Sequence, residues 1–119
     1  MSIVYEQILI KEIHKYDEWT IDKQITIKKM KKEIGHLVFT EDLRDKDIYI
    51  AFIKVEDQYQ RQGYGTKLLK ELEKYAKENQ FKKIKADVLG NFEFWTKNGF
   101  KFGRKGHFDI TWPCSKEIL

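Results

Sequence analysis

The sequence predicts one α/β (α+β) domain that spans residues 1–119. Two observations support this fold class. Apolar residues recur at strand spacing before and after one clear amphipathic helix at residues 66–79, so strands and helices are interleaved. The chain is also long enough for one hydrophobic core and short for two ordinary domains.

Strands are expected ahead of this helix. Residues 8–13 suit either a strand or a short helix, whereas residues 25–30 and 34–40 each predict a strand. A charged loop is expected at residues 41–47. Residues 48–55 are apolar almost throughout, which indicates a central strand covered on both faces.

The helix at residues 66–79 has one apolar and one charged face. The apolar face consists of Leu68, Leu69, Leu72, Tyr75 and Ala76. After the helix, residues 84–88 alternate as in a half-buried strand, and residues 92–98 suit a short helix. Residues 100–104 and 107–112 predict a closing hairpin.

Composition narrows the functional classes. A hydrophobic content of 41% with 14% aromatic residues indicates a globular chain. No apolar run approaches the ~18 residues of a membrane span, so no membrane partner is expected. The net charge of +4, from 23 basic and 19 acidic residues, suits a polyanionic ligand. It falls short of the dense basic footprint of a dedicated nucleic-acid binder, so no nucleic-acid partner is expected.

Cysteine and histidine usage predicts neither a disulfide nor a metal site. Cys114 is the single cysteine, and the histidines lack the spacing of metal ligands. Charged residues interrupt residues 1–13, so no signal peptide is expected. We therefore expect a cytoplasmic protein.

The most informative segment is a glycine loop between the strand at 48–55 and the helix at 66–79. Its sequence is Gln60-Arg61-Gln62-Gly63-Tyr64-Gly65-Thr66. Backbone N–H groups at such a helix start have no intrahelical partner, and the helix dipole favours negative charge there. Glycine also lets a phosphate approach the backbone. A plain strand-to-helix turn uses glycine as well, so a pyrophosphate site and a turn both remain open at this point.

A second motif decides between these interpretations. The loop lacks the third glycine of the dinucleotide fingerprint and the Gly-Lys-Ser/Thr ending of a P-loop. Downstream stands Phe94-Trp95-Thr96-Lys97-Asn98-Gly99-Phe100. The two segments resemble the Gln/Arg-x-x-Gly-x-Gly/Ala and Phe-Tyr-x-Lys-x-Gly-Phe elements of the GNAT superfamily, the acetyl-CoA-dependent N-acetyltransferases. The resemblance covers roughly residues 20–119.

This resemblance implies a particular fold. The family has a mixed, splayed and mostly antiparallel sheet flanked by helices, with the cofactor between the fourth and fifth strands. Two helices usually separate its first two strands, but only residues 15–23 are available here. The shortened helical region implies an acceptor side that is open, or completed by another chain in a homodimer.

The resemblance also implies roles for individual residues. The loop backbone would hold the pyrophosphate of acetyl-CoA, and residues 53–55 would pair with the pantetheine arm. The N–H near Ile53 would polarise the thioester carbonyl. The implied cofactor-binding residues are Ile53, Lys54, Val55, Gln60, Arg61, Gln62, Gly63, Tyr64, Gly65, Thr66, Asn91 and Trp95.

Two of these residues have alternative interpretations. Asn91 departs from the family's spacing and suits a helix-capping turn equally well. Trp95 stands where the family commonly has the tyrosine that protonates the leaving thiolate, and an indole N–H is only a hydrogen-bond donor. Trp95 would line the thioester pocket, or it would pack in the core.

No residue is a ready base for the acceptor amine. Families of this kind often place Glu or His early in the fourth strand, and Tyr49 occupies that position. His36, on the preceding strand, has suitable chemistry, although a lone histidine is more often structural. Tyr49 and His36 are therefore the candidate catalytic residues, and direct attack by a neutral amine is the alternative.

The sequence thus predicts an N-acetyltransferase that uses acetyl-CoA. It would acetylate a primary amine of a small molecule or a protein by direct transfer in a ternary complex. The alternative is an acyl-CoA-binding or interaction module with a GNAT-like fold and weak or no transfer, which Trp95 and the missing base motivate. A basic domain without a cofactor is a further alternative, against which the glycine loop argues.

Overall fold

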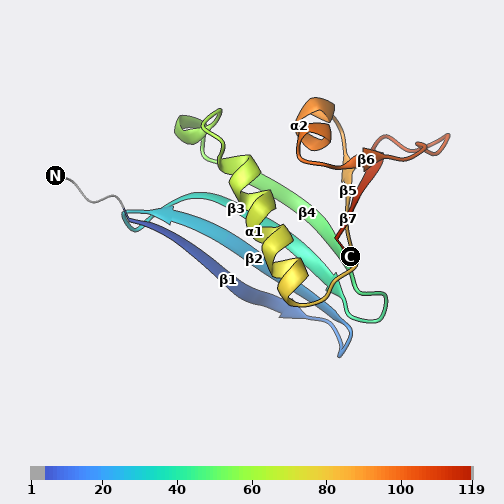
Figure 1. Ribbon diagram of the computed structural model, residues 1–119, viewed down its shortest axis with the longest axis horizontal. Helices are drawn as coiled ribbons and strands as arrows, with labels where there is room; N and C mark the ends of the chain where they lie inside the picture. Colours follow the sequence, from blue (N-terminus) through green and yellow to red (C-terminus); the bar gives the residue numbers. More distant parts are fainter. Residues whose placement is uncertain (1–4, 119) are drawn as a thin grey trace.

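The computed structural model describes residues 5–118 as a seven-stranded sheet with helices packed beside it (Figure 1). The strands are β1 (Glu6–Lys15), β2 (Thr20–Lys29), β3 (Lys32–Asp42), β4 (Asp47–Val55), β5 (Lys83–Val88), β6 (Lys101–Phe102) and β7 (Trp112–Glu117). The helices are the 3-10 turn η1 (Asp57–Tyr59), α1 (Tyr64–Glu78) and α2 (Phe92–Lys97). The helices predicted at residues 66–79 and 92–98 are both present.

The strand order is β1-β2-β3-β4-β5-β7-β6. All neighbours are antiparallel except β4 and β5, which are parallel. This is the mixed, mostly antiparallel sheet that the sequence predicted. Residues 8–13, which suited either a strand or a helix, lie within the edge strand β1.

The sheet is splayed between β4 and β5. β4 continues to Val55, but its pairing with β5 ends where Ile50 lies opposite Ala86. The register between β3 and β4 shifts at the same point, where Ala51 is the extra residue of a β-bulge. A bulge bends its strand and increases the local twist, so β4 leaves β5 here and a gap opens beyond Ile50.

The core lies between α1 and one face of β2, β3 and β4 (Figure 1). Leu68, Leu69, Leu72 and Ala76 form the buried face of α1, as the sequence predicted. Burying an aliphatic side chain stabilises the fold by ~1.5–3 kcal/mol, so this face holds the helix on the sheet. None of the helices among the described residues is long and apolar enough to cross a membrane.

A buried carboxylate also joins α1 to the sheet. Glu41 of β3 is only 2% exposed, and its Oε1 lies 2.9 Å from Nζ of Lys23 on β2. The hydroxyl of Tyr75 on α1 donates to the other carboxylate oxygen and accepts a 2.8 Å hydrogen bond from Lys23. Since an unpaired buried charge is strongly destabilising, this triad fixes the position of α1 over β2 and β3.

The N-terminal region differs from the pattern that the resemblance implies. Residues 15–23 are not helical, because β1 turns directly into β2 through residues 16–19. Oδ1 of Asp17 accepts 2.8 Å hydrogen bonds from the N–H groups of Trp19 and Thr20, which closes the turn. The two helices that usually separate these strands are thus replaced by a tight hairpin.

Two further expectations about the sheet are wrong. Residues 48–55 are covered on one face only, because Ile48 and Ile50 are buried under α1 while Tyr49 and Phe52 on the other face are exposed. The second strand of the closing hairpin is β7, which begins at Trp112 instead of residue 107. A loop therefore occupies most of the segment that was predicted as a strand.

Candidate functional site

A cavity of about 510 Å³ opens where β4 and β5 part. Its walls come from the end of β4, the glycine loop, the first turn of α1 and one side of α2. The predicted site residues that line it are Ile53, Val55, Gln60, Arg61, Gly63, Tyr64, Gly65, Thr66 and Asn91. The structure therefore brings together residues that the sequence places on four different elements.

Side chains of the glycine loop hydrogen-bond to nearby backbone carbonyls and fix its conformation. Nε2 of Gln60 donates to the carbonyl oxygen of Val55 at 3.0 Å, and Nε2 of Gln62 donates to the carbonyl oxygen of Gln58 at 3.0 Å. Arg61 and Gly63 have positive φ angles of 62° and 85°. These bonds fix the backbone of the loop and direct the Gln62 side chain back to η1, outside the cavity.

The start of α1 presents unpaired backbone donors to the cavity. Gly63 is the N-cap residue, and no side chain caps the helix. The first intrahelical bond runs from the N–H of Lys67 to the carbonyl of Gly63, at 3.0 Å. The N–H groups of Tyr64, Gly65 and Thr66 therefore have no intrahelical acceptor, and with the helix dipole they form a site that favours an anion.

The free edge of β4 forms a second set of backbone donors and acceptors. The N–H of Glu56 donates to the carbonyl of Ile34 in β3 at 2.9 Å. Because the peptide groups of a strand point alternately to its two sides, the N–H and C=O of Ile53 and the N–H of Val55 point away from β3 and into the gap. The carbonyl of Val55 points the same way but accepts the hydrogen bond from Gln60. Lys54 has the opposite orientation, is exposed and does not line the cavity. An extended ligand fits beside this edge as an additional strand would.

Helix α2 supplies the remaining wall. Asn91 adopts a left-handed conformation, φ 57°, at the N-cap position, but its side chain makes no capping hydrogen bond. Phe94 lines the cavity, whereas Trp95 is buried in the core with its ring 5.0 Å from that of Phe100. The structure therefore places Asn91 at the cavity and Trp95 behind it.

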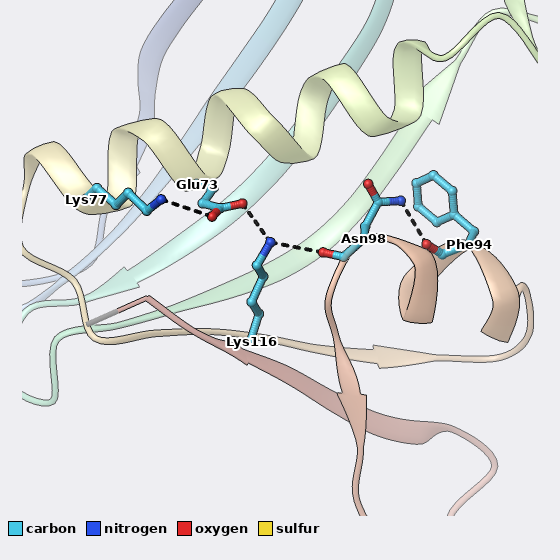
Figure 2. A network of polar contacts seen from close by, with 5 residues as sticks. All are labelled: Glu73, Lys77, Phe94, Asn98 and Lys116. Atoms are coloured by element: carbon cyan, nitrogen blue, oxygen red, sulfur yellow. Dashed lines mark hydrogen bonds and ion pairs between the residues drawn. The ribbon is translucent and has the colours of Figure 1, made fainter.

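A polar network fixes α2 against α1 and β7 (Figure 2). Nζ of Lys116 on β7 lies 2.7 Å from Oε2 of Glu73 on α1 and donates to the carbonyl of Asn98 at 3.0 Å. The Asn98 side chain donates to the carbonyl of Phe94 at 2.8 Å. Burial raises the pKa of Glu73, but the hydrogen bonds from Lys116 and Lys77 outweigh it and lower the pKa overall.

The two candidate catalytic residues lie on the sheet face opposite α1 and do not meet. Tyr49 pairs with Thr40 across β3 and β4, and its hydroxyl donates to Oδ2 of Asp87 at 3.2 Å. Burial and the nearby Asp87 carboxylate raise the pKa of Tyr49. Nδ1 of His36 lies 3.0 Å from Oε2 of Glu33. His36 therefore has a partner on its own strand, and its ring also packs edge-on against Phe52 of β4 at a centroid distance of 5.1 Å.

The sequence analysis did not assign a site role to three residues that line the cavity, or to Asp87, which contacts Tyr49. Tyr59, Phe94 and Lys97 line the cavity. They stand within or directly beside the two motifs, so the motifs themselves carry the signal for them. Asp87 has no such signal, because its contact with Tyr49 depends on the pairing of strands that lie far apart in the sequence. Among the described residues, no group of three His, Cys, Asp or Glu side chains could hold a metal ion.

Comparison with known proteins gives a family and a fold. The sequence matches the acetyltransferase (GNAT) family over residues 4–100. Tetrahymena GCN5 has a TM-score of 0.72 at 19% identity and covers 87% of this chain and 71% of its own. The N-acetyltransferase PaiA from Thermoplasma acidophilum, in complex with coenzyme A, has a TM-score of 0.69 at 19% identity, over 79% of this chain and 59% of its own.

N-acetylglutamate synthase from Neisseria gonorrhoeae, complexed with coenzyme A and N-acetyl-glutamate, has a TM-score of 0.71 at 15% identity. The match covers 81% of this chain but only 26% of the synthase. No curated protein matches the sequence significantly. Identities this low show the fold alone, whereas the family match covers most of the sequence. The chain belongs to the acetyltransferase (GNAT) family.

Proposed function

We propose that this protein is an N-acetyltransferase that moves an acetyl group from acetyl-CoA to a primary amine by direct transfer in a ternary complex. The observation that carries the proposal is the cavity beside the splayed end of β4, which combines an anion-binding helix start with a strand edge that no other strand pairs. Two crystal structures of similar fold have coenzyme A bound, and family membership supports the same ligand class.

The residues of this chain have distinct roles in the proposal. The N–H groups of residues 61–66 bind the pyrophosphate, and Arg61 and Lys97 add positive charge to the cavity wall. The free edge at Ile53 and Val55 pairs with the pantetheine arm, and the N–H of Ile53 polarises the thioester carbonyl. Catalysis then rests on positioning the amine and the thioester together and on stabilising the charge that develops on the carbonyl oxygen.

Coenzyme A binding is tested by thermal unfolding with and without coenzyme A. A ligand that binds only the folded state raises the melting temperature by mass action. We expect a shift for the wild type and none for Gly63→Glu, which places a negative charge in the phosphate site. Gly63→Ala is the matched control, because both variants require an unfavourable positive φ and a Cβ at this position meets no atom within 4 Å. A wild-type protein without any shift at saturating coenzyme A would contradict the proposal.

The alternative function is an acyl-CoA-binding module without efficient transfer. The burial of Trp95 favours it, because a core indole cannot protonate a leaving thiolate. Free thiol release from acetyl-CoA in the presence of spermidine or lysine-containing peptides separates the two functions. Coenzyme A binding with no release above the rate without an amine would favour the module.

A further inference from the structure

Tyr49 and Asp87 meet at the apex where β4 and β5 part. The last paired residues of the two strands are Ile50 and Ala86, and Asp87 directly follows Ala86. The hydroxyl of Tyr49 donates to Oδ2 of Asp87 at 3.2 Å. Both side chains lie on the face opposite α1, since Ile50 and Ala86 point into the core. The phenol of Tyr49 and the carboxylate of Asp87 therefore lie at the point where the two strands separate, on the sheet face that α1 does not cover.

The proposed cofactor cavity lies on the other face of β4 and is lined by this strand from Ile53 onward. The side chains of Ile53 and Val55 lie on the α1 face, opposite Leu37 and Gly35 of β3. A ligand that runs from the glycine loop along β4 brings its far end towards Ile50. Tyr49 is 39% exposed and lines, with Asp87, a hollow of about 280 Å³ on the opposite face. An acceptor in this hollow approaches the far end of the ligand without displacing it.

We propose that Tyr49 and Asp87 bind a cationic primary amine and remove its proton, with Tyr49 in contact with the nitrogen. This inference rests on the proposed function. The ammonium donates a proton to Oη of Tyr49 while the phenol proton passes to Oδ2 of Asp87 and then to solvent. The freed nitrogen lone pair forms the C–N bond to the thioester carbon. The C–S bond breaks, the sulfur takes the electron pair, and a second nitrogen proton goes to the sulfur.

The charges around the pair are compatible with this role. Lys83 and Lys85 of β5 and Cys114 of β7 line the same hollow. Asp42 of β3 and Asp47 of β4 lie on the other side of Tyr49. Nζ of Lys85 is 3.1 Å from Oδ2 of Asp47, so the adjacent cation is paired with a different carboxylate. Asp87 thus keeps its charge available for an incoming ammonium.

The test measures acetylation of three acceptors. Spermidine is the small acceptor. The other two are peptides, one with a lysine ε-amine and a blocked N-terminus and one with only an α-amine. Their ordinary pKa values are ~10.4 for the ε-amine and ~7.7–8.0 for the α-amine. We expect Asp87→Asn to lower lysine acetylation at pH 7.5 by ~10²-fold or more, the usual contribution of a positioned proton acceptor. The deficit should shrink towards pH 10 and be smaller for the α-amine. Coenzyme A should stabilise the variant as it does the wild type.

Two further variants separate a proton relay from a structural role. Tyr49→Phe should reproduce the pH-dependent deficit, and the double variant should be no slower than the slower single variant, because the residues act as a unit. Asp42→Asn removes a carboxylate charge beside Tyr49 without freeing Lys85. Its amide oxygen can still accept the N–H bonds of Arg44 and Asp45, so this variant should stay close to the wild type. Wild-type turnover of Asp87→Asn at every pH, or losses that multiply in the double variant, would overturn the inference. A wild type that binds coenzyme A but acetylates none of the three acceptors would overturn both this inference and the proposed transfer, whereas failure to bind coenzyme A counts against the cofactor site itself.

Discussion

Gly65 of α1 and Phe94 of α2 are in contact at the wall of the cavity. A Cβ at Gly65 would lie 3.1 Å from Cε1 and 3.2 Å from Cζ of the phenyl ring. A Cβ at Gly63 would meet no atom within 4 Å, but Gly63 has a φ of 85°. Glycine is therefore needed at the two positions for different reasons. Gly63 allows the positive φ angle of the backbone, and Gly65 allows α2 to pack against the first turn of α1.

The first prediction follows from this contact. Gly65→Ala should destabilise the protein by about 1–3 kcal/mol, because a methyl group is forced against the ring, and should weaken the coenzyme A shift because Phe94 moves at the cavity wall. Urea unfolding and thermal shift measure the two effects. Phe94→Leu in the Gly65→Ala background should recover part of both losses. A Gly65→Ala variant with wild-type stability and a wild-type coenzyme A shift would contradict this prediction, because it would show that the Phe94 ring can move aside without loss of stability or binding.

The second prediction concerns the network at Lys116 (Figure 2). Lys116→Met removes the bonds to Glu73 and to the carbonyl of Asn98, both at partly buried positions. We expect a loss of about 1.5–3 kcal/mol in unfolding free energy at pH 7, the range for hydrogen bonds to charged groups. The loss should also loosen α2 and reduce the coenzyme A shift.

This stabilisation depends on pH with a definite sign. The folded-state pKa of Glu73 lies below its ordinary value of 4.5, so its contribution is present above that value and is lost as the pH falls through the folded-state pKa. The difference between wild type and Lys116→Met should therefore be largest near neutral pH and smaller in acid. Lys77→Met, which removes only a more exposed partner 3.3 Å from Glu73, should cost less. An equal loss for Lys77→Met would contradict the assigned importance of Lys116.

The parts of the site that the sequence predicts are those built from neighbouring residues. The loop at residues 60–66 and the amphipathic pattern that follows it are local, so the strand, loop and helix are recognisable together. The contact between Tyr49 and Asp87 is not, because it needs the parallel register of β4 and β5. The exposed face of β4 could not be predicted from the sequence either, because an apolar run looks the same whether one or both faces of the strand are covered.

The third prediction concerns Cys114. Burial and, to a smaller extent, Asp87 raise the pKa of its thiol from 9.0 to about 11. Because only the thiolate is nucleophilic, iodoacetamide should alkylate the native protein slowly at pH 8 and faster as the pH approaches 11. In urea the same cysteine should react with the pH dependence of an ordinary thiol. Rapid native alkylation at pH 8 would contradict the raised pKa.

The same shift predicts a loss of stability in alkali. The folded state keeps the Cys114 proton to a higher pH than the unfolded state does, so its contribution is fully present below pH 9.0 and declines as the pH rises towards 11. Cys114→Ala should flatten this part of the stability profile. Tyrosines with raised pKa values add a similar slope, so the comparison rests on the difference between the variant and the wild type.

The last prediction concerns Trp95, which stands at the position of the family's acidic tyrosine. Trp95 is 6% exposed, and its ring packs edge-on against Phe94 and Phe100 at centroid distances of 5.5 and 5.0 Å. Trp95→Phe and Trp95→Tyr should each destabilise the protein by about 1–3 kcal/mol, because a smaller ring leaves a void in the core. Tyr should cost more than Phe, since its hydroxyl needs a partner in an apolar environment.

Turnover then shows whether the indole acts only in packing. If it does, both variants should keep the acetyl transfer rate and the coenzyme A affinity of the wild type when measured well below their melting temperatures. A gain for Trp95→Tyr alone would show that a phenol at this position reaches the thiolate and supplies a proton, an effect typically worth ~10²–10⁴-fold. A large fall in both variants at unchanged coenzyme A affinity would instead assign the indole N–H a direct part in transfer. The ratio of the two variants is decisive, because both lose the indole while only one gains an acidic proton.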